Sequence, residues 1–228
     1  MIPAYNEAEN IESVVRSWHE EAEKTGADCK LFVIDDGSTD DTYHKLLAMQ
    51  KRYPFLQAKS KLNGGHGAAI LYGYHEAVKH GADYIFQTDS DGQTLPEEFG
   101  QFWENRKDFD IQIGFRENRQ DGFGRIIVTK ILHILLFLFF HVRTKDANTP
   151  FRLMTGSSVS TLLTKIPEAY RLTNVLLTVL YEKSNYKIRY IPISFRARQG
   201  GVNSINLQKI CRIGIETICD FMRLRKKI

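Results

Sequence analysis

Residues 84–93 read YIFQTDSDGQ, a short apolar run followed by two carboxylates with one residue between them. The apolar run predicts a buried strand, and Asp89 and Asp91 follow at its carboxyl end. Carboxylates that share one crevice repel each other unless a divalent cation lies between them. The stretch therefore predicts a site for a metal ion that binds phosphates. The simpler alternative is a polar turn in which Asp caps the next helix.

Two other predicted strands end in polar side chains in the same way. Residues 31–34 are apolar and lead into Asp35 and Asp36 ahead of a helix start, and residues 1–7, MIPAYNE, read as the tail of a strand. In an open parallel sheet the ligand crevice lies outside the carboxyl ends of the strands. The three clusters should therefore converge on one pocket that suits a nucleoside diphosphate.

Helix and strand patterns alternate along the chain, which predicts an α/β fold. The first helix should place Ile11, Val14, Val15 and Trp18 on one face. The expected helices run from Asn6 to about Lys24, from Ser38 or Thr39 to about Arg52, from His66 to His80 and onward from Pro96, and further strands cover residues 56–59 and 111–115. The sequence thus predicts a doubly wound, mainly parallel sheet with helices on both faces.

Six short motifs in order carry a family resemblance. They are IPAYNE at 2–7, IDDGS at 34–38, NGGHGA at 63–68, DSDGQ at 89–93, DANTPFR at 146–152 and FRARQGGVNS at 195–204. The first four resemble the signatures of family two glycosyltransferases, which have the GT-A (Rossmann-like) fold. The last two are similar to the branch that includes dolichyl-phosphate mannosyltransferase and bacterial polyprenyl-phosphate glycosyltransferases.

The resemblance implies a metal-dependent, inverting transfer of a sugar from a nucleoside diphosphate to a polyprenyl (dolichyl or undecaprenyl) phosphate. Mg²⁺ or Mn²⁺ would be the cofactor, because both prefer oxygen ligands and act as Lewis acids on a departing diphosphate. By resemblance, Asp89 and Asp91 hold the metal and Ser90 and Gln93 line the diphosphate side. The base and ribose contacts implied by the same motifs are Pro3, Tyr5, Glu7, Ile34 and Asp36.

An acceptor phosphate is already an anion, so it needs cations to place it and no strong general base. The matching family positions are Arg116, Arg125 and Arg198, and Thr129 stands where the family often has Ser. The expected catalytic group is Asp89, Asp91, Arg116 and Arg198. Asp146 and Arg152 are expected to pair and shape the site.

The glycine-rich motif at 63–67, NGGHG, fits neither a dinucleotide fingerprint nor a P-loop. A tight turn that caps a helix is the plain interpretation, and in the family this turn lies close to the sugar nucleotide. His75 and Glu76 do not begin a zinc-protease motif, since Lys79 stands where that motif requires His.

Residues 131–142 form an apolar block that is too short to cross a bilayer as a helix and is flanked by Arg125, Lys130, Arg143 and Lys145. One interpretation is an interfacial helix over 125–142 that lies on a membrane surface, with a second electrostatic contact from the basic residues 223–227. The other is a buried core helix. The first interpretation predicts a peripheral protein at the cytoplasmic face, with a membrane protein or a second copy as a possible partner.

The chain has 228 residues, of which 43% are hydrophobic, and no linker-like stretch, so it should form one domain over 1–228. The positions of the motifs would give this domain a nucleotide-sugar half over 1–115 and an acceptor half over 116–228. Its net charge of +4 is too small to indicate nucleic-acid binding. Cys29, Cys211 and Cys219 show no metal spacing, which favours reduced thiols in the cytosol.

Two other functions remain open at this point. A saccharide acceptor would need a carboxylate base beyond the metal pair, and a catalytically idle module would only bind nucleotide sugar or membrane. Only Met1 and Ile2 precede Pro3, so we expect the first strand to be largely missing and the neighbouring strands to be left with unpaired backbone groups. The chain would then be a shortened version that folds poorly alone. Adding a strand before Met1 should raise its thermal midpoint.

Overall fold

Three parallel strands form the first of two adjoining sheets: β1 (Ile2–Ala4), β2 (Leu31–Asp35) and β3 (Leu56–Ser60). The computed structural model describes all residues except 27, 117–122, 169, 197–206 and 226–228, together with the side chains at 123–127 and 207–215. β2 is buried along its whole length, as its unbroken apolar run indicates. Its pairing with β1, from Ile2 opposite Val33 to Ala4 opposite Asp35, brings the ends of both strands to one edge.

The second sheet has the order β4-β6-β5-β7 and is formed by β4 (Tyr84–Gln87), β5 (Ile111–Arg116), β6 (Arg152–Thr155) and β7 (Ile188–Ile193). Met1 links the two sheets into one layer, because its nitrogen donates to Phe86 O and its carbonyl accepts from Thr88 N at 3.2 Å. The predicted doubly wound, mainly parallel sheet is confirmed. β6 is an exception that the sequence did not indicate, since it runs antiparallel to both neighbours.

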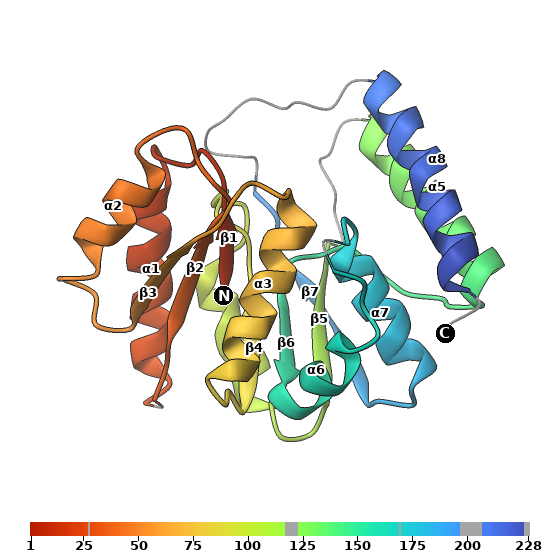
Figure 1. Ribbon diagram of the computed structural model, residues 1–228. Helices are drawn as coiled ribbons and strands as arrows, with labels where there is room; N and C mark the ends of the chain where they lie inside the picture. The colour runs from red at the N-terminus through yellow and green to blue at the C-terminus, as the bar shows by residue number, and fades with distance from the viewer. Residues whose placement is uncertain (27, 117–122, 169, 197–206, 226–228) are drawn as a thin grey trace.

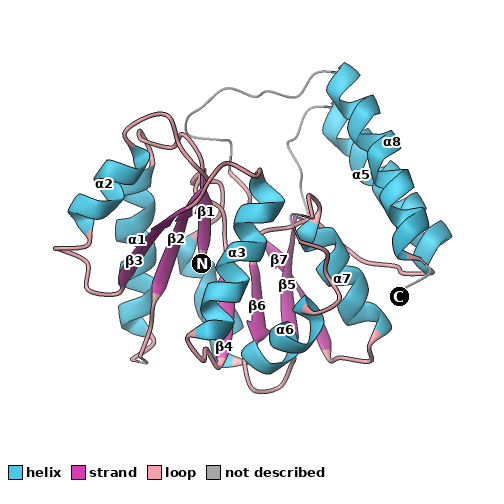
Figure 2. Ribbon diagram, in the orientation of Figure 1, coloured by secondary structure: helices cyan, strands magenta, loops and turns pink. Residues whose placement is uncertain are grey.

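Helices cover both faces of this sheet (Figures 1 and 2). One face carries α3 (His66–Lys79), α6 (Gly156–Leu163) and α7 (Thr173–Lys183), and the other carries α1 (Ile11–Lys24), α2 (Thr42–Met49), a 3-10 turn η1 (Pro96–Phe99) and α4 (Gly100–Glu104). Each face buries its own hydrophobic cluster. In the second cluster Trp18 contacts the rings of Phe86 and Phe151 at 5.2 and 6.0 Å between centroids, which fastens α1 to the sheet.

Two helix starts differ from the sequence-based prediction for one shared reason. α1 begins at Ile11 and not at Asn6, and α2 begins at Thr42 and not after Ser38 or Thr39. Asn6 has a positive φ of 53°, its N–H donates to Ser38 Oγ at 2.9 Å, and its side-chain oxygen accepts from Thr39 N at 2.8 Å. The residues expected to start the two helices therefore tie two loops together.

α5 (Phe123–Phe140) and α8 (Leu207–Leu224) pack side by side at one end of the molecule (Figure 1). Phe140 and Phe221 are buried with ring centroids 5.0 Å apart, whereas Ile134 and Leu138 are each 58% exposed. The apolar block therefore has one face in the core, as the core-helix interpretation predicts, and one open face, whose contact with a membrane remains a prediction. Among the described residues no helix has the length and apolar content needed to span a membrane.

We expect Gly156→Ala to lower the free energy of unfolding by about 3 kcal/mol, as overpacking of a closed site does. A Cβ there would lie 1.7 Å from the carbonyl oxygen of Ala82, and the adjoining backbone is held by a 2.7 Å bond from Gly156 N to Asp83 O. Gly100→Ala is the matched control, because nothing lies within 4 Å of its added Cβ. Urea unfolding should show the control unchanged or slightly more stable, and equal stabilities would contradict the close approach.

Candidate functional site

A pocket of about 400 Å³ opens at the carboxyl ends of β1, β2 and β4. The three polar clusters noted in the sequence all contribute to its walls, together with the glycine-rich motif. The lining residues are Pro3, Ala4, Tyr5, Glu7, Asp36, Asn63, Gly65, His66, Ala69, Asp89, Ser90 and Asp91. Of the residues named from the sequence for donor and metal, the structure thus brings together Pro3, Tyr5, Glu7, Asp36, Asp89, Ser90 and Asp91.

The loop after β1 is held in place by the loop after β2. Besides the contacts of Asn6, the N–H of Glu7 donates to Thr42 Oγ1 at 2.9 Å and the N–H of Ala8 donates to Asp40 Oδ2 at 3.1 Å. The carboxylate of Glu7 is buried and accepts from Asn10 Nδ2 at 3.0 Å, while Tyr5 is 47% exposed at the pocket. The first wall of the pocket therefore joins a fixed acid to an accessible aromatic ring.

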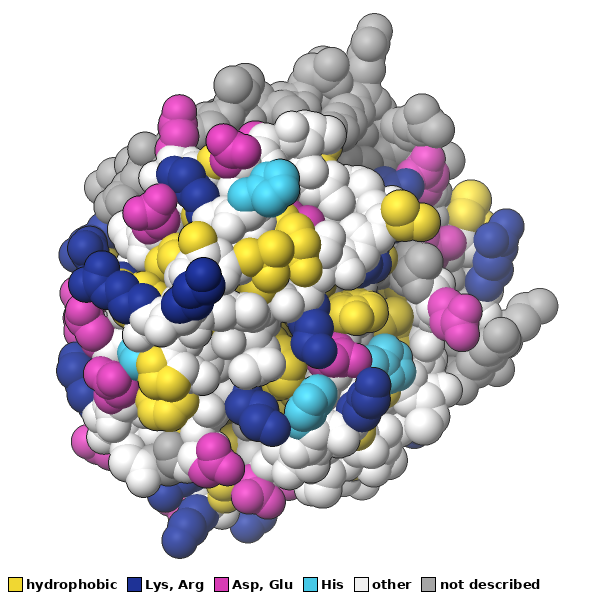
Figure 3. Space-filling model, turned by 60° about the vertical axis from the view of Figure 1, so that its left-hand side comes forward, with side chains coloured by type: hydrophobic (Ala, Val, Ile, Leu, Met, Phe, Trp, Pro, Cys, Tyr) yellow, Lys and Arg dark blue, Asp and Glu magenta, His cyan; other side chains and the backbone are white. Residues whose placement is uncertain are grey.

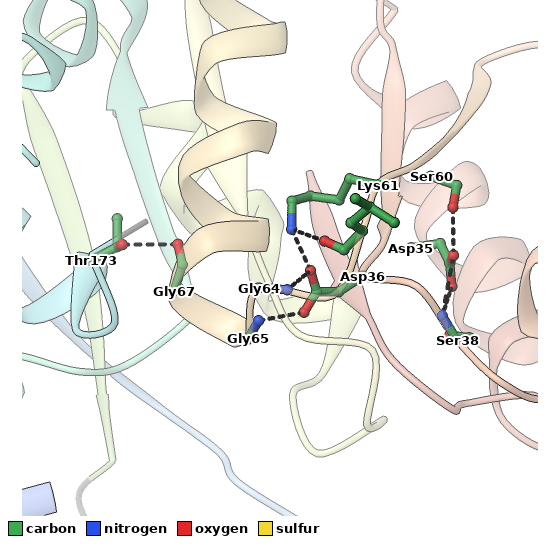
Figure 4. Close-up of polar contacts among 10 residues, drawn as sticks. Asp35, Asp36, Ser38, Ser60, Lys61, Gly64, Gly65, Gly67 and Thr173 are labelled. Carbon is green, nitrogen blue, oxygen red and sulfur yellow. Dashed lines mark hydrogen bonds and ion pairs between the residues drawn. The ribbon is translucent and has the colours of Figure 1, made fainter. Parts of the chain in front are cut away.

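Asp36 meets residues 61–65, which we call the glycine turn (Figure 4). Its Oδ1 accepts from Lys61 Nζ at 2.6 Å and from Gly64 N at 3.0 Å, and its Oδ2 accepts from Gly65 N at 2.7 Å. Gly65 has a φ of 85°, a conformation that a side chain disfavours. The turn leads into α3 and places Asn63, Gly65 and His66 at the pocket.

Asp89 and Asp91 also line the pocket. Asp89 Oδ1 is buried without a hydrogen-bond partner among the described residues, and His66 Nε2 lies 3.7 Å from it. Burial raises the pKa of Asp89, although His66 and Arg116 act in the opposite direction. Asp91 Oδ1 accepts from Gln93 N at 3.1 Å. A buried carboxylate oxygen that lacks a donor is suited to a cation.

The fit to a metal ion follows from the same two carboxylates. In the described part of the chain no three His, Cys, Asp or Glu side chains gather as a complete metal cluster. Mg²⁺ and ions of similar preference are usually held by one or two carboxylates, and water and phosphate oxygens fill their other positions. Asp89 and Asp91 therefore suit an ion that arrives with a phosphate ligand better than a structural metal.

Two residues predicted for the donor site have other surroundings. Ile34 is 0% exposed and does not line the pocket, because its side chain belongs to the hydrophobic cluster on the face of the sheet that carries α3. Gln93 is buried, and its Nε2 donates to the carbonyl of Arg196 at 2.8 Å, while Arg196 N donates back to Gln93 O at 2.8 Å. Gln93 thus joins the loop of Asp91 to the segment after β7.

The acceptor residues are only partly described. Arg116 is bidentate to Asp146, with Nε at 2.8 Å and Nη2 at 3.1 Å, and its guanidinium lies over the ring of Phe195 at 4.9 Å. Thr129 is half-buried on α5. Arg198 and the side chain of Arg125 lie outside the described residues.

The predicted pairing of Asp146 with Arg152 was wrong. Asp146 pairs with Arg116, whereas the guanidinium of Arg152 is fully buried and donates to the carbonyls of Thr149 and Asn174 at 2.7 and 3.1 Å. Arg152 is the first residue of an antiparallel strand whose position the sequence did not reveal. Its contacts lie inside the core, so it shapes the loop that precedes β6 without forming that ion pair.

Sequence reasoning did not name Asn63, His66 or Ala69 as site residues, although all three line the pocket. A signal was present, because the glycine-rich motif follows a short strand directly and opens a helix. What the motif could not reveal was the side chain that its backbone N–H groups enclose. That side chain, Asp36, lies 28 and 29 residues earlier in the chain than Gly64 and Gly65.

The family described as glycosyl transferase family 2 matches residues 1–161. Among solved structures, glucosyl-3-phosphoglycerate synthase from Mycobacterium tuberculosis in complex with phosphoglyceric acid superimposes with a TM-score of 0.71 at 19% identity, over 99% of this chain and 78% of that one. The same enzyme with Mn²⁺, uridine diphosphate and glucosyl-3-phosphoglycerate gives 0.70 at 20% identity, over 100% and 78%. At this identity the likeness shows the shared fold.

We expect Asp89→Asn to stabilise the metal-free protein at neutral pH by about 1 kcal/mol, since it removes a partly buried charge, one of whose oxygens has no donor among the described residues. Burial raises the pKa of Asp89 above its value in the unfolded chain, so the folded state binds the proton more tightly. The free energy of unfolding of the wild type should therefore fall as pH rises from about 4 through the folded pKa, and the advantage of the variant should grow over that range. Urea unfolding between pH 4 and 8 measures the difference, and a variant that is less stable than the wild type at pH 7 would contradict it.

Proposed function

Because the chain belongs to glycosyl transferase family 2, we propose that this glycosyltransferase moves a sugar, with inversion, from a nucleoside diphosphate to a phosphate-bearing acceptor and depends on a divalent metal ion. One observation carries the proposal. The pocket at the strand ends joins a carboxylate pair, one of whose buried oxygens has no donor in the described part of the chain, to a wall of polar and aromatic residues. Solved relatives of the same fold bind Mn²⁺ with uridine diphosphate or uridine-diphosphate-glucose.

The donor would lie across the pocket with its phosphates toward Asp89 and Asp91. Mg²⁺ or Mn²⁺ bound there supplies positive charge to the departing diphosphate. Pro3, Tyr5 and Glu7 form the wall for the nucleoside, and Ser90 lies on the phosphate side. Tyr5 offers an exposed ring for stacking, and Glu7 offers a fixed acceptor for ribose hydroxyls or base N–H groups.

For the acceptor we propose polyprenyl phosphate. Arg116, held by Asp146 and Phe195, gives a fixed cation near the carboxylate pair, and it is close enough to lower the pKa of Asp89. An anionic oxygen so placed can attack the sugar without a general base. Arg125, Thr129 and Arg198 belong to the same proposal through their motifs. On this proposal residues 1–115 serve the donor and residues 116–228 the acceptor.

A small phosphate is the second candidate acceptor. The solved relatives bind phosphoglyceric acid, which shares an anionic phosphate with the lipid but lacks its apolar tail. Purified protein with Mn²⁺ should be tested with uridine- and guanosine-diphosphate sugars against short polyprenyl phosphates, phosphoglycerate and a simple saccharide. Transfer to the lipid alone supports the first proposal, and transfer to phosphoglycerate replaces it with the second.

The open face of α5 favours an acceptor that resides in a membrane. Ile131, Ile134 and Leu138 are exposed along one side of the helix, and the exposed charges nearest its carboxyl end are Arg143 and Lys145. Such a face suits the headgroup region of an anionic bilayer. Figure 3 shows a different face, where Lys, Arg, Asp and Glu side chains are interspersed with small hydrophobic patches over the described residues.

We expect Asp91→Asn to lower turnover by about tenfold to several hundredfold, because the loss of one ligand charge weakens stabilisation of the leaving diphosphate. Steady-state rates at saturating Mn²⁺ and in excess chelator measure the effect. Asp83→Asn is the control, since Asp83 is exposed at the opposite end of β4 and should leave the rate unchanged. Full activity of Asp91→Asn, or of the wild type in chelator, would refute the metal assignment.

We also expect the double variant Ile134→Asp, Leu138→Asp to lose binding to anionic vesicles while its thermal midpoint stays close to that of the wild type. Both side chains are 58% exposed, so they add little to the core. Leu136→Asp is the matched control on the same helix, because Leu136 is 0% exposed and a buried charge should unfold the pair α5 and α8. Vesicle sedimentation and thermal unfolding separate the cases, and unaltered vesicle binding by the double variant would overturn the membrane contact.

A further inference from the structure

Residues 194–196, which we call the β7 extension, follow β7 and lie outside its ladder. The pairing of β7 with β5 ends at Ile193, which lies opposite Arg116. The next backbone N–H, that of Ser194, donates to the carboxylate of Glu98 and lies 2.9 and 3.1 Å from its two oxygens. A side chain of η1 therefore binds the backbone at the point where the sheet ends.

The other end of the β7 extension is bonded to Gln93. Arg196 N donates to the carbonyl of Gln93, and Gln93 Nε2 donates to the carbonyl of Arg196, both at 2.8 Å. Glu97 adds an ion pair of 3.7 Å with Arg196, between side chains that are both more than half exposed, and such pairs contribute little. Glu98 is thus the carboxylate that holds the extension at the end nearest the sheet.

The carboxylate loop, residues 88–95, is fixed independently of the β7 extension. Thr88 Oγ1 and Thr94 Oγ1 lie 2.8 Å apart and join the two ends of this loop by a buried hydrogen bond. At the end of η1, Phe99 is buried, and its ring lies 4.8 Å from that of Phe86 on β4. Loss of the bond from the β7 extension to η1 would therefore release the extension and leave the loop in place.

The β7 extension carries Phe195, whose ring contacts Arg116. The guanidinium of Arg116 lies over this ring at 4.9 Å, and Asp146 accepts from its Nε and Nη2. A carboxylate fixes the edge of a guanidinium, and a stacked ring fixes the tilt of its plane. The orientation of Arg116 therefore depends on where Phe195 lies, and Phe195 directly follows Ser194 in the chain.

We propose that Glu98 is a positioning residue for the acceptor side of the reaction. It fixes the backbone of the β7 extension, this backbone places the ring of Phe195, and the ring sets the plane in which Arg116 meets an acceptor phosphate. The proposal rests on the proposed function for the role of Arg116. An arginine already held in one plane loses less freedom when it binds a phosphate. Glu98 does not line the pocket, so it acts through the extension and not by contact with the donor.

Two substitutions remove the same hydrogen bond from its opposite ends. Glu98→Ala removes the acceptor, and Ser194→Pro removes the N–H. With Mn²⁺ and the donor that the wild type uses, each should lower kcat/KM about five- to tenfold for short polyprenyl phosphate or for phosphoglycerate, whichever the wild type accepts. Calorimetric titration should show the affinity for the donor's nucleoside diphosphate unchanged. An equal loss of that affinity would show that Glu98 serves the carboxylate loop and would overturn the proposal.

Matched variants at the same positions keep the bond. Ser194→Ala retains the N–H and should leave kcat/KM unchanged, and Glu98→Gln retains one acceptor oxygen and should restore most of the rate lost in Glu98→Ala. Glu104→Gln, at an exposed residue of α4, is the control for the loss of a nearby charge. The double variant Glu98→Ala, Ser194→Pro should be no slower than the slower single variant, because both changes remove one bond. Losses that multiply in the double variant would contradict the proposal.

Amide hydrogen exchange tests the link without a substrate. Glu98→Ala should speed exchange at Ser194 and Arg196, while the amide of Gln93, which is bonded to Asp91 within the carboxylate loop, should keep its rate. Unchanged exchange at Ser194 would overturn the proposal even if kcat/KM falls. Should the wild type transfer sugar to neither acceptor, the proposed function fails, and the exchange result alone decides whether Glu98 fixes the β7 extension.

Discussion

Carboxylates at the ends of buried strands must each find a donor or a cation, and much of the pocket is arranged around that requirement. Asp35 and Asp36 find theirs within the chain, in serine groups and in the glycine turn. Asp89 Oδ1 has no hydrogen-bond donor among the described residues. Asp36 thus lines the pocket with its oxygens already bonded, whereas Asp89 lines it with one oxygen that has no donor in that part of the chain.

The local features of the sequence predicted the fold well. Continuous apolar runs located β2 and β4, the residues between His66 and Gly81 located α3, and the rule for parallel sheets brought three distant clusters to one pocket. These signals come from residues that are close together in the sequence. The start of α2 was misjudged because Thr39 bonds to Asn6, and a bond between residues 33 positions apart leaves no mark in a local pattern. The same holds for Asp36 and the glycine turn, and for the choice of Arg116 over Arg152 as the partner of Asp146.

Two arginines stiffen the region around Asp146 in opposite ways. Arg116 lies near the surface of the site, where an anion and an aromatic ring fix the plane of its guanidinium. Arg152 is enclosed and bonds to backbone carbonyls and to Thr178 Oγ1, with no carboxylate among its hydrogen-bond partners in the described residues. Burial lowers the pKa of Arg152, yet an arginine keeps its charge, so the carbonyl dipoles must compensate it. Arg152 therefore fixes the loop between residues 146 and 150 through its bonds to the carbonyls of Ala147 and Thr149. Asp146, at the start of this loop, binds Arg116.

The antiparallel strand β6 has a consequence for recombination between relatives. Every described residue that lines this pocket lies within residues 3–91, which suggests that the chain after β5 could be replaced by a segment grafted from a relative. Such a graft would remove β6, the strand that pairs with β4 directly beneath the Asp89 loop, and would leave β4 with an open edge. The cut that preserves the sheet falls after Thr155, inside the segment that the family match covers. The modular unit of this protein is thus longer than its binding pocket, and a chimera has to inherit a strand from beyond the site in order to keep the site intact.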